Sequence, residues 1–326
     1  MAGLNFLGIG NYNKPGKGVR KDEPQKPAFI RFFQLIGRKW AQFIQLNLIF
    51  DVGVLVTFGL SFVVNMFTTN IFLCALPYLL LSPLVAGMAY ITRNFANEQH
   101  VFLWSDFKQQ VKENWKAFAI NGIVTYIVVG VLYIAIPTYF QSMSNSWIWG
   151  IPLGICLIVA MVFLFSQFYI PIMIVTFDMK LRHIYKNGLM FSVIGLWRNL
   201  FILIVLLALL FGFYIGFLWD FTTAMISLLI LSVLAFAFVF YLISFMVYPL
   251  IDKYMIQPYQ KKPEEVQAAL PQQEKTEISE NEESAEETKA EETTQKKESD
   301  YVFVNGKLVK RSEYKTDDES IFVDRI

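Results

Sequence analysis

The stretch Ser82-Pro-Leu-Val-Ala-Gly-Met-Ala-Tyr-Ile-Thr-Arg93 leaves a long apolar run and ends on a basic residue. A polar and apolar mixture follows, Val101-Phe-Leu-Trp-Ser-Asp-Phe-Lys-Gln-Gln-Val-Lys-Glu-Asn-Trp115, and a new apolar run begins near Phe118. The same order of proline, exit, tryptophan beside a basic residue and new apolar run recurs later in the chain. This alternation predicts membrane-spanning helices joined by amphipathic connections.

The composition agrees with that class. Hydrophobic residues make up 55% of the 326 residues and aromatic residues 16%, and the mean hydropathy is +0.44. A soluble domain has about 45–50% apolar residues. Because the excess is concentrated in long runs, we expect an all-α membrane protein.

Six runs are long enough to cross a bilayer, since a span needs about 20 mostly apolar residues. They cover residues 46–66, 71–92, 118–140, 148–176, 200–219 and 224–251. Residues 29–45 alternate apolar and basic side chains at helical spacing, which predicts a separate helix on the membrane surface before the first span. We therefore expect six spans arranged as three hairpins.

Lysine and arginine are confined to alternate connections. The N-terminus, the connections after the second and fourth spans, and the segment after the sixth span all carry them, whereas the connections near residues 68–70, 141–147 and 220–223 carry none. Basic residues favour the cytoplasmic side. The sequence thus predicts a multi-pass membrane protein with both termini in the cytoplasm.

Each even-numbered span carries a proline near its basic end, at Pro83, Pro171 and Pro249. Membrane helices tolerate proline because neighbouring groups can replace the lost backbone hydrogen bond. We interpret each return helix as broken at its proline, and we treat the three prolines as candidate functional positions.

The connection after the second span predicts an amphipathic helix, because Trp104, Phe107, Val111 and Trp115 follow steps of three and four residues. The connection after the fourth span shows the same spacing until Gly195. Both helices could simply rest on the bilayer. They could also dock a transporter subunit or a cytosolic protein, and the four apolar residues of the first helix are the candidate contacts.

Asn47 and Asp51 are four residues apart and so share one face of the first span. Carboxylates inside membranes are costly and often functional. Asp51 stands near the cytoplasmic end of the span, however, so a structural role at the interface and a role in proton or cation handling both remain open.

Few residues suit a catalytic or metal centre. Cys74 and Cys156 lie inside apolar runs, and His100 and His183 stand in separate connections. A zinc site needs more ligands close together. We therefore expect no disulfide framework, no cofactor and no enzymatic activity, and nothing in the sequence indicates binding to nucleic acid.

The chain divides into four parts: a flexible basic N-terminus (1–28), the six-helix membrane domain (29–262), an acidic linker (263–300) and a short C-terminal segment (301–326). The linker has little aliphatic bulk, which is typical of disorder. Around Asn305-Gly306 the C-terminal segment alternates like a β-hairpin, with Phe303 opposite Leu308. These two residues are further candidate contacts for a partner.

Four short motifs carry a resemblance: Phe32-Phe-Gln-Leu-Ile-Gly-Arg38, Leu46-Asn-Leu48, Gly87-Met-Ala-Tyr-Ile-Thr-Arg93 and Trp104-Ser-Asp-Phe107. With them, the membrane domain resembles the YesL family. The resemblance implies a small polytopic bacterial membrane protein of unknown biochemical function, often encoded beside systems for carbohydrate uptake and degradation. It supplies no catalytic or ligand-binding residue.

The function we expect is that of a non-enzymatic accessory or regulatory component associated with carbohydrate uptake. The alternative is a transporter in its own right, with Asp51 and the proline-containing helices lining a path.

Overall fold

The computed structural model describes residues 27–257, 301–304 and 307–310. Within this part of the chain six helical segments are long and apolar enough to cross a membrane. They run over Ala28–Phe67, Ile71–Ala96, Leu103–Ser142, Trp147–Thr176, Leu196–Trp219 and Phe221–Ile256. The predicted all-helical architecture with six spans is confirmed, and the chain is by this criterion a multi-pass membrane protein.

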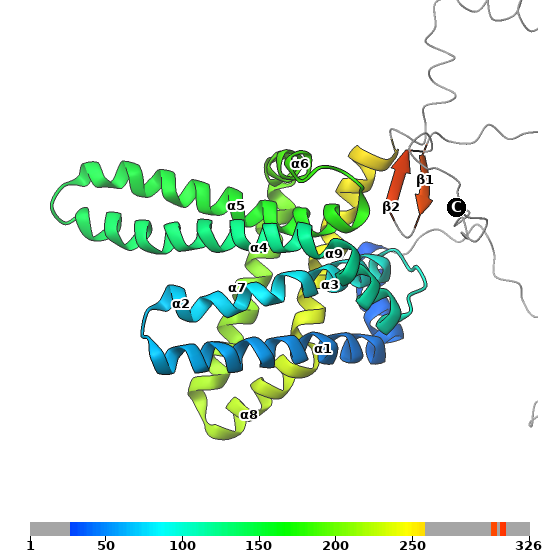
Figure 1. The fold of residues 1–326 in the computed structure, drawn as a ribbon, viewed down its shortest axis with the longest axis horizontal. Coiled ribbons are helices and arrows are strands. Elements are labelled where there is room, and N and C mark those ends of the chain that lie inside the picture. The colour runs from blue at the N-terminus through cyan, green and yellow to red at the C-terminus, as the bar shows by residue number, and fades with distance from the viewer. Residues whose placement is uncertain (1–26, 258–300, 305–306, 311–326) are drawn as a thin grey trace, which may run out of the picture.

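The spans form three consecutive hairpins (Figure 1). The first joins α1 (Ala28–Phe67) to α2 (Ile71–Ala75), the 3-10 helix η2 (Leu76–Leu81) and α3 (Ser82–Ala96). The second joins α4 (Leu103–Ser142), through η3 (Trp147–Trp149), to α5 (Gly150–Thr176). After α6 (Leu181–Ile194), the third joins α7 (Leu196–Trp219) to α8 (Phe221–Ile230), η4 (Leu231–Ala235), α9 (Phe236–Ile251) and η5 (Asp252–Ile256).

Helix α9 lies at the centre of the bundle. Its side chains Tyr241 and Phe245 pack in one core cluster with α1 and α3, and its Val247 and Ile251 pack in a second cluster with α5 and α6. The Tyr241 ring stacks on Phe32, with ring centroids 5.0 Å apart. The last span therefore joins the first hairpin to the second.

The separate helix expected at residues 29–45 before the first span is found in part. The backbone of Lys39 is not helical (φ −113°, ψ 16°), so α1 is kinked there, and residues 28–38 form a short helix ahead of the one that continues through the first span. The contacts at this kink explain its position: Arg38 pairs with Glu98 at 2.7 Å, and Lys39 Nζ donates to the Gln99 carbonyl at 3.2 Å. The chain bends where it meets the connection between α3 and α4.

The first amphipathic helix, by contrast, is not a separate element. Residues predicted as a helix of their own form the beginning of α4, which continues into the third span over 40 residues. No glycine or proline separates the two parts, so nothing stops the helix where its composition changes. The second amphipathic helix is found as α6, and Gly195 caps it.

The proline-broken return helices are found in only one of the three hairpins. Pro83 stands in the first turn of α3, directly after the 3-10 helix η2. Pro171 lies inside α5, which runs on to Thr176, and Pro249 stands two residues before α9 passes into the π-helical turn η5. A proline removes one N–H donor, and a packed membrane helix tolerates that loss.

Two short strands complete the described elements. β1 (Tyr301–Val304) pairs antiparallel with β2 (Lys307–Lys310), with Val302 opposite Val309 and Phe303 opposite Leu308. This is the register that the sequence predicts. The predicted turn at Asn305-Gly306, the linker at 263–300 and the basic N-terminus at 1–26 lie outside the described residues.

Candidate functional site

Asn47 joins the first span to a π-helical turn of the last. The side chain is fully buried. Its Nδ2 donates to the carbonyls of Leu231 (3.3 Å) and Ser232 (2.7 Å), and its Oδ1 accepts from the N–H of Ala237 at 2.9 Å. A π-helical turn disturbs the α-helical hydrogen-bond pattern. The amide of Asn47 thus supplies hydrogen-bond partners to backbone carbonyls at the beginning of η4 and to a backbone N–H just after its end.

Asp51 lies one turn further along α1 and is half-buried. Its Oδ2 accepts from Asn47 Nδ2 at 3.2 Å. The two residues that the sequence placed on one helix face are therefore in contact, and Asn47 also binds the last span. This geometry makes Asn47 a packing residue that also holds the carboxylate of Asp51.

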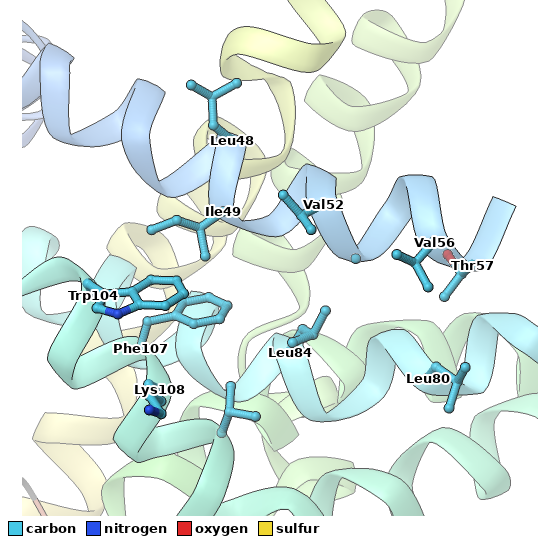
Figure 2. Close-up of a pocket in the computed structure, with 12 residues that line it drawn as sticks. Leu48, Ile49, Val52, Val56, Thr57, Leu80, Leu84, Trp104, Phe107 and Lys108 are labelled. Atoms are coloured by element: carbon cyan, nitrogen blue, oxygen red, sulfur yellow. The ribbon is translucent and has the colours of Figure 1, made fainter. Parts of the chain in front are cut away.

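An apolar groove runs along the adjacent face of α1 (Figure 2). It has a volume of about 640 Å³, within the usual range for ligand sites. The groove lies between α1, the second span and the beginning of α4. Its lining consists of Leu48, Ile49, Val52, Gly53, Val56, Thr57, Leu80, Leu84, Trp104, Phe107, Lys108 and Val111.

Three of the four candidate contacts of the first amphipathic stretch line this groove. Trp104 is 66% exposed at one end, whereas Phe107 is only 5% exposed and packs into the core. A Cβ on Gly87 would overlap the Phe107 ring, so glycine at that position lets α3 approach α4 closely. Trp115 is exposed and does not line the groove. The stretch is therefore divided between a groove wall and a free surface.

The other candidate residues lie elsewhere. Pro83 precedes the groove residue Leu84, while Pro171 and Pro249 belong to helices whose neighbouring side chains form the second core cluster. The strands carrying Phe303 and Leu308 form a two-stranded sheet of their own. The structure does not gather these residues into one site.

Sequence reasoning missed several polar links between helices. Arg93 is buried and donates from Nη1 to the Val175 carbonyl (3.2 Å) and to Thr176 Oγ1 (3.0 Å). Thr92 Oγ1 lies 3.0 Å from Ser244 Oγ, which connects α3 to α9. The signal was present, because polar residues inside apolar runs usually face other helices.

Two more links join the second hairpin to its neighbours. Tyr169 donates its hydroxyl proton to Asn199 Oδ1 at 2.8 Å, which links α5 to α7. Tyr185 of α6 donates to Asn121 Oδ1 at 2.6 Å, and Asn121 in turn donates to Gln167 Oε1 at 3.1 Å. Burial raises the pKa of Tyr185 to about 12. Its hydroxyl is therefore a stable hydrogen-bond donor at neutral pH.

Among residues 27–257, 301–304 and 307–310, no group of three or more His, Cys, Asp or Glu side chains stands close enough to hold a metal ion. Asp51 is a titratable side chain inside a span and has Asn47 as its polar neighbour.

The comparisons with known proteins give one match. Residues 60–136 match a family described as "Protein of unknown function, DUF624". This segment covers the end of α1, the second span and most of α4, and so includes half of the residues that line the groove. No curated protein and no solved structure matches the chain.

Proposed function

We propose that the protein is a non-enzymatic accessory component of a carbohydrate-uptake system in the bacterial cell membrane, with both termini in the cytoplasm, and that it belongs to the YesL family. The matched segment supports the family assignment, because it contains two of the motifs on which the resemblance rests, Gly87–Arg93 and Trp104–Phe107. The link to carbohydrate uptake rests on that resemblance.

One observation carries the accessory role: the polar side chains inside the spans join helices to one another. Asn47 binds the last span, Thr92 contacts Ser244, and Tyr169 binds Asn199. A solute path needs polar groups that face a lumen, whereas these groups make the bundle rigid. A rigid bundle suits a platform that holds other proteins.

Surfaces for such partners lie at the end of the bundle that carries the basic residues. Trp115 and Trp197 are both exposed there, at 51% and 83%. The β1–β2 hairpin offers a second surface, since in the part of the chain that the structure describes no third strand pairs with it. A partner's sheet can extend over such an edge.

The accessory role is tested by purifying the tagged full-length chain from its native membranes. We expect a transporter subunit or transport ATPase to co-purify at a fixed ratio, and to be lost when the chain is truncated after Lys262. A variant with Asn305→Pro and Gly306→Pro should mimic the truncation, because proline cannot adopt the positive φ of the preferred turn. Asn305→Asp keeps an Asp-Gly turn and serves as the matched control. Retention of every partner by the truncated chain would contradict hairpin docking.

The alternative is a transporter, and the contact between Asp51 and Asn47 inside a span is the observation that favours it. Asp51→Asn keeps an oxygen that can accept from Asn47 but removes the charge. If the purified protein alone moves a sugar into liposomes, and Asp51→Asn abolishes this while the exposed control Asp178→Asn does not, the accessory role is wrong.

A further inference from the structure

The apolar groove has the length of one bilayer leaflet. It follows α1 from Leu48 to Thr57, and at 1.5 Å per helical residue these nine steps cover about 14 Å. The hydrocarbon core of a bilayer is about 30 Å thick, so one leaflet contributes about 15 Å. An extended chain lying in the groove would therefore reach from the membrane interface to about the bilayer midplane.

The long wall of the groove is apolar and open. Val52 is 64% exposed and Leu80 57% exposed, although both belong to segments that cross the membrane. At the deep end, Thr57 Oγ1 donates to the carbonyl of Val54 at 2.9 Å, so this hydroxyl needs no outside partner. The deep end thus suits a hydrocarbon chain and offers nothing to a polar solute.

The opposite end of the groove carries the basic side chain of Lys108 and the indole ring of Trp104. Figure 2 shows Trp104, Phe107 and Lys108 together at the left of the view, away from Leu80 and Thr57. In the described part of the chain Lys108 forms no ion pair, and the nearby carboxylate of Asp106 accepts from the N–H of Phe102 at 2.9 Å. Tryptophan and lysine are the residues that anchor proteins at the level of lipid headgroups.

We propose that this groove binds one anionic phospholipid, with an acyl chain along α1 and the second span and the headgroup phosphate against Lys108. The apolar length selects a hydrocarbon chain, and the single cation at the interfacial end selects a negative headgroup. This site goes beyond the proposed accessory role and does not depend on it. The beginning of α4, with Trp104 and Lys108, forms the headgroup end of the site.

The test is native mass spectrometry of the full-length chain, released from detergent after incubation with equal amounts of phosphatidylglycerol and phosphatidylcholine. We expect one phosphatidylglycerol per chain to be retained in preference to phosphatidylcholine. Lys108→Gln should reduce this preference about fivefold, because one basic residue at the interface contributes about that factor. Lys186→Gln, an exposed lysine on α6 away from the groove, should leave the preference unchanged.

A second pair of variants tests the acyl chain. Val52→Trp places a large ring in the groove and should abolish retention of both lipids, whereas Val63→Trp places the same ring on exposed α1 surface beyond the groove and should not. Val56→Phe repeats the block with a smaller change if Val52→Trp fails to fold. Equal retention of the two lipids by the wild type and by Lys108→Gln would overturn the proposal. So would a dimer that Val52→Trp dissociates in the absence of bound lipid, because a second copy of the chain would then cover the groove.

Discussion

Asn47 illustrates how much one buried amide can hold in a membrane protein. Its four hydrogen bonds, to Asp51, Leu231, Ser232 and Ala237, connect residues up to 190 positions apart. Nothing in the sequence indicates that three of these partners, Leu231, Ser232 and Ala237, lie in the last span. The sequence placed Asn47 beside Asp51 on one helix face, but only the fold shows that the pair faces a π-helical turn.

We expect Asn47→Leu to destabilise the protein by about 2 kcal/mol, since an interhelical hydrogen bond in a membrane contributes about 0.6 kcal/mol on average. Leucine has a similar size but leaves the backbone groups of η4 without these partners. The measurement is the thermal unfolding midpoint of the purified protein in detergent. Asn145→Ala, at an exposed position in the turn after α4, should shift the midpoint little. Equal shifts in the two variants would show that the hydrogen bonds of Asn47 add no stability.

The raised pKa of Tyr185 predicts that the folded protein loses stability at high pH. An unfolded tyrosine has a pKa near 10, and burial raises the pKa of Tyr185 to about 12. The stabilising contribution of the protonated hydroxyl is therefore fully present below about pH 10 and is lost as the pH rises through about 12. Between pH 9 and 11 the unfolding midpoint of Tyr185→Phe should fall less than that of the wild type. The exposed Tyr214→Phe controls for removal of a hydroxyl, and an unchanged fall in Tyr185→Phe would contradict the assignment.

The junction between α6 and α7 depends on Gly195, which has no side chain. A Cβ on Gly195 would overlap the Tyr169 hydroxyl and would lie 3.2 Å from Leu250 Cδ2. Gly195→Ala should displace Tyr169 from Asn199 and lower stability by about 1–3 kcal/mol, the usual cost of overpacking. Gly154→Ala meets no atom within 4 Å and should be neutral or stabilising, because alanine favours helix. The measurement is the free energy of unfolding of both variants in detergent. Equal values would mean that the junction can expand to fit the added methyl group.

The positions of the spans were readable from the sequence, but the continuity of the helices was not. Hydropathy marks where a chain enters the hydrocarbon, and it located all six spans. It does not report whether a helix stops there, and α1 and α4 both continue through that boundary. The kink at Lys39 could not be predicted either, because that residue is neither proline nor glycine. Arg38 and Lys39 contact Glu98 and Gln99 there, and these contacts form only in the folded protein. The groove was equally hidden, since its walls come from three separate segments.

An even number of spans places the two termini of the membrane domain on the same side of the membrane, and the basic residues predict which side that is. In a chain with Cys74→Ala and Cys156→Ala, a new cysteine at Ser144 should react with a membrane-impermeant maleimide in intact cells. A cysteine at Ser105 should react only after the membrane is opened. Both positions are exposed, so burial does not explain a difference between them. The reverse pattern would place the end of the groove that carries Trp104 and Lys108 at the outer leaflet. Lys108 would then meet the lipids of that leaflet, and the hairpin at Tyr301–Lys310 would have no access to a cytosolic partner.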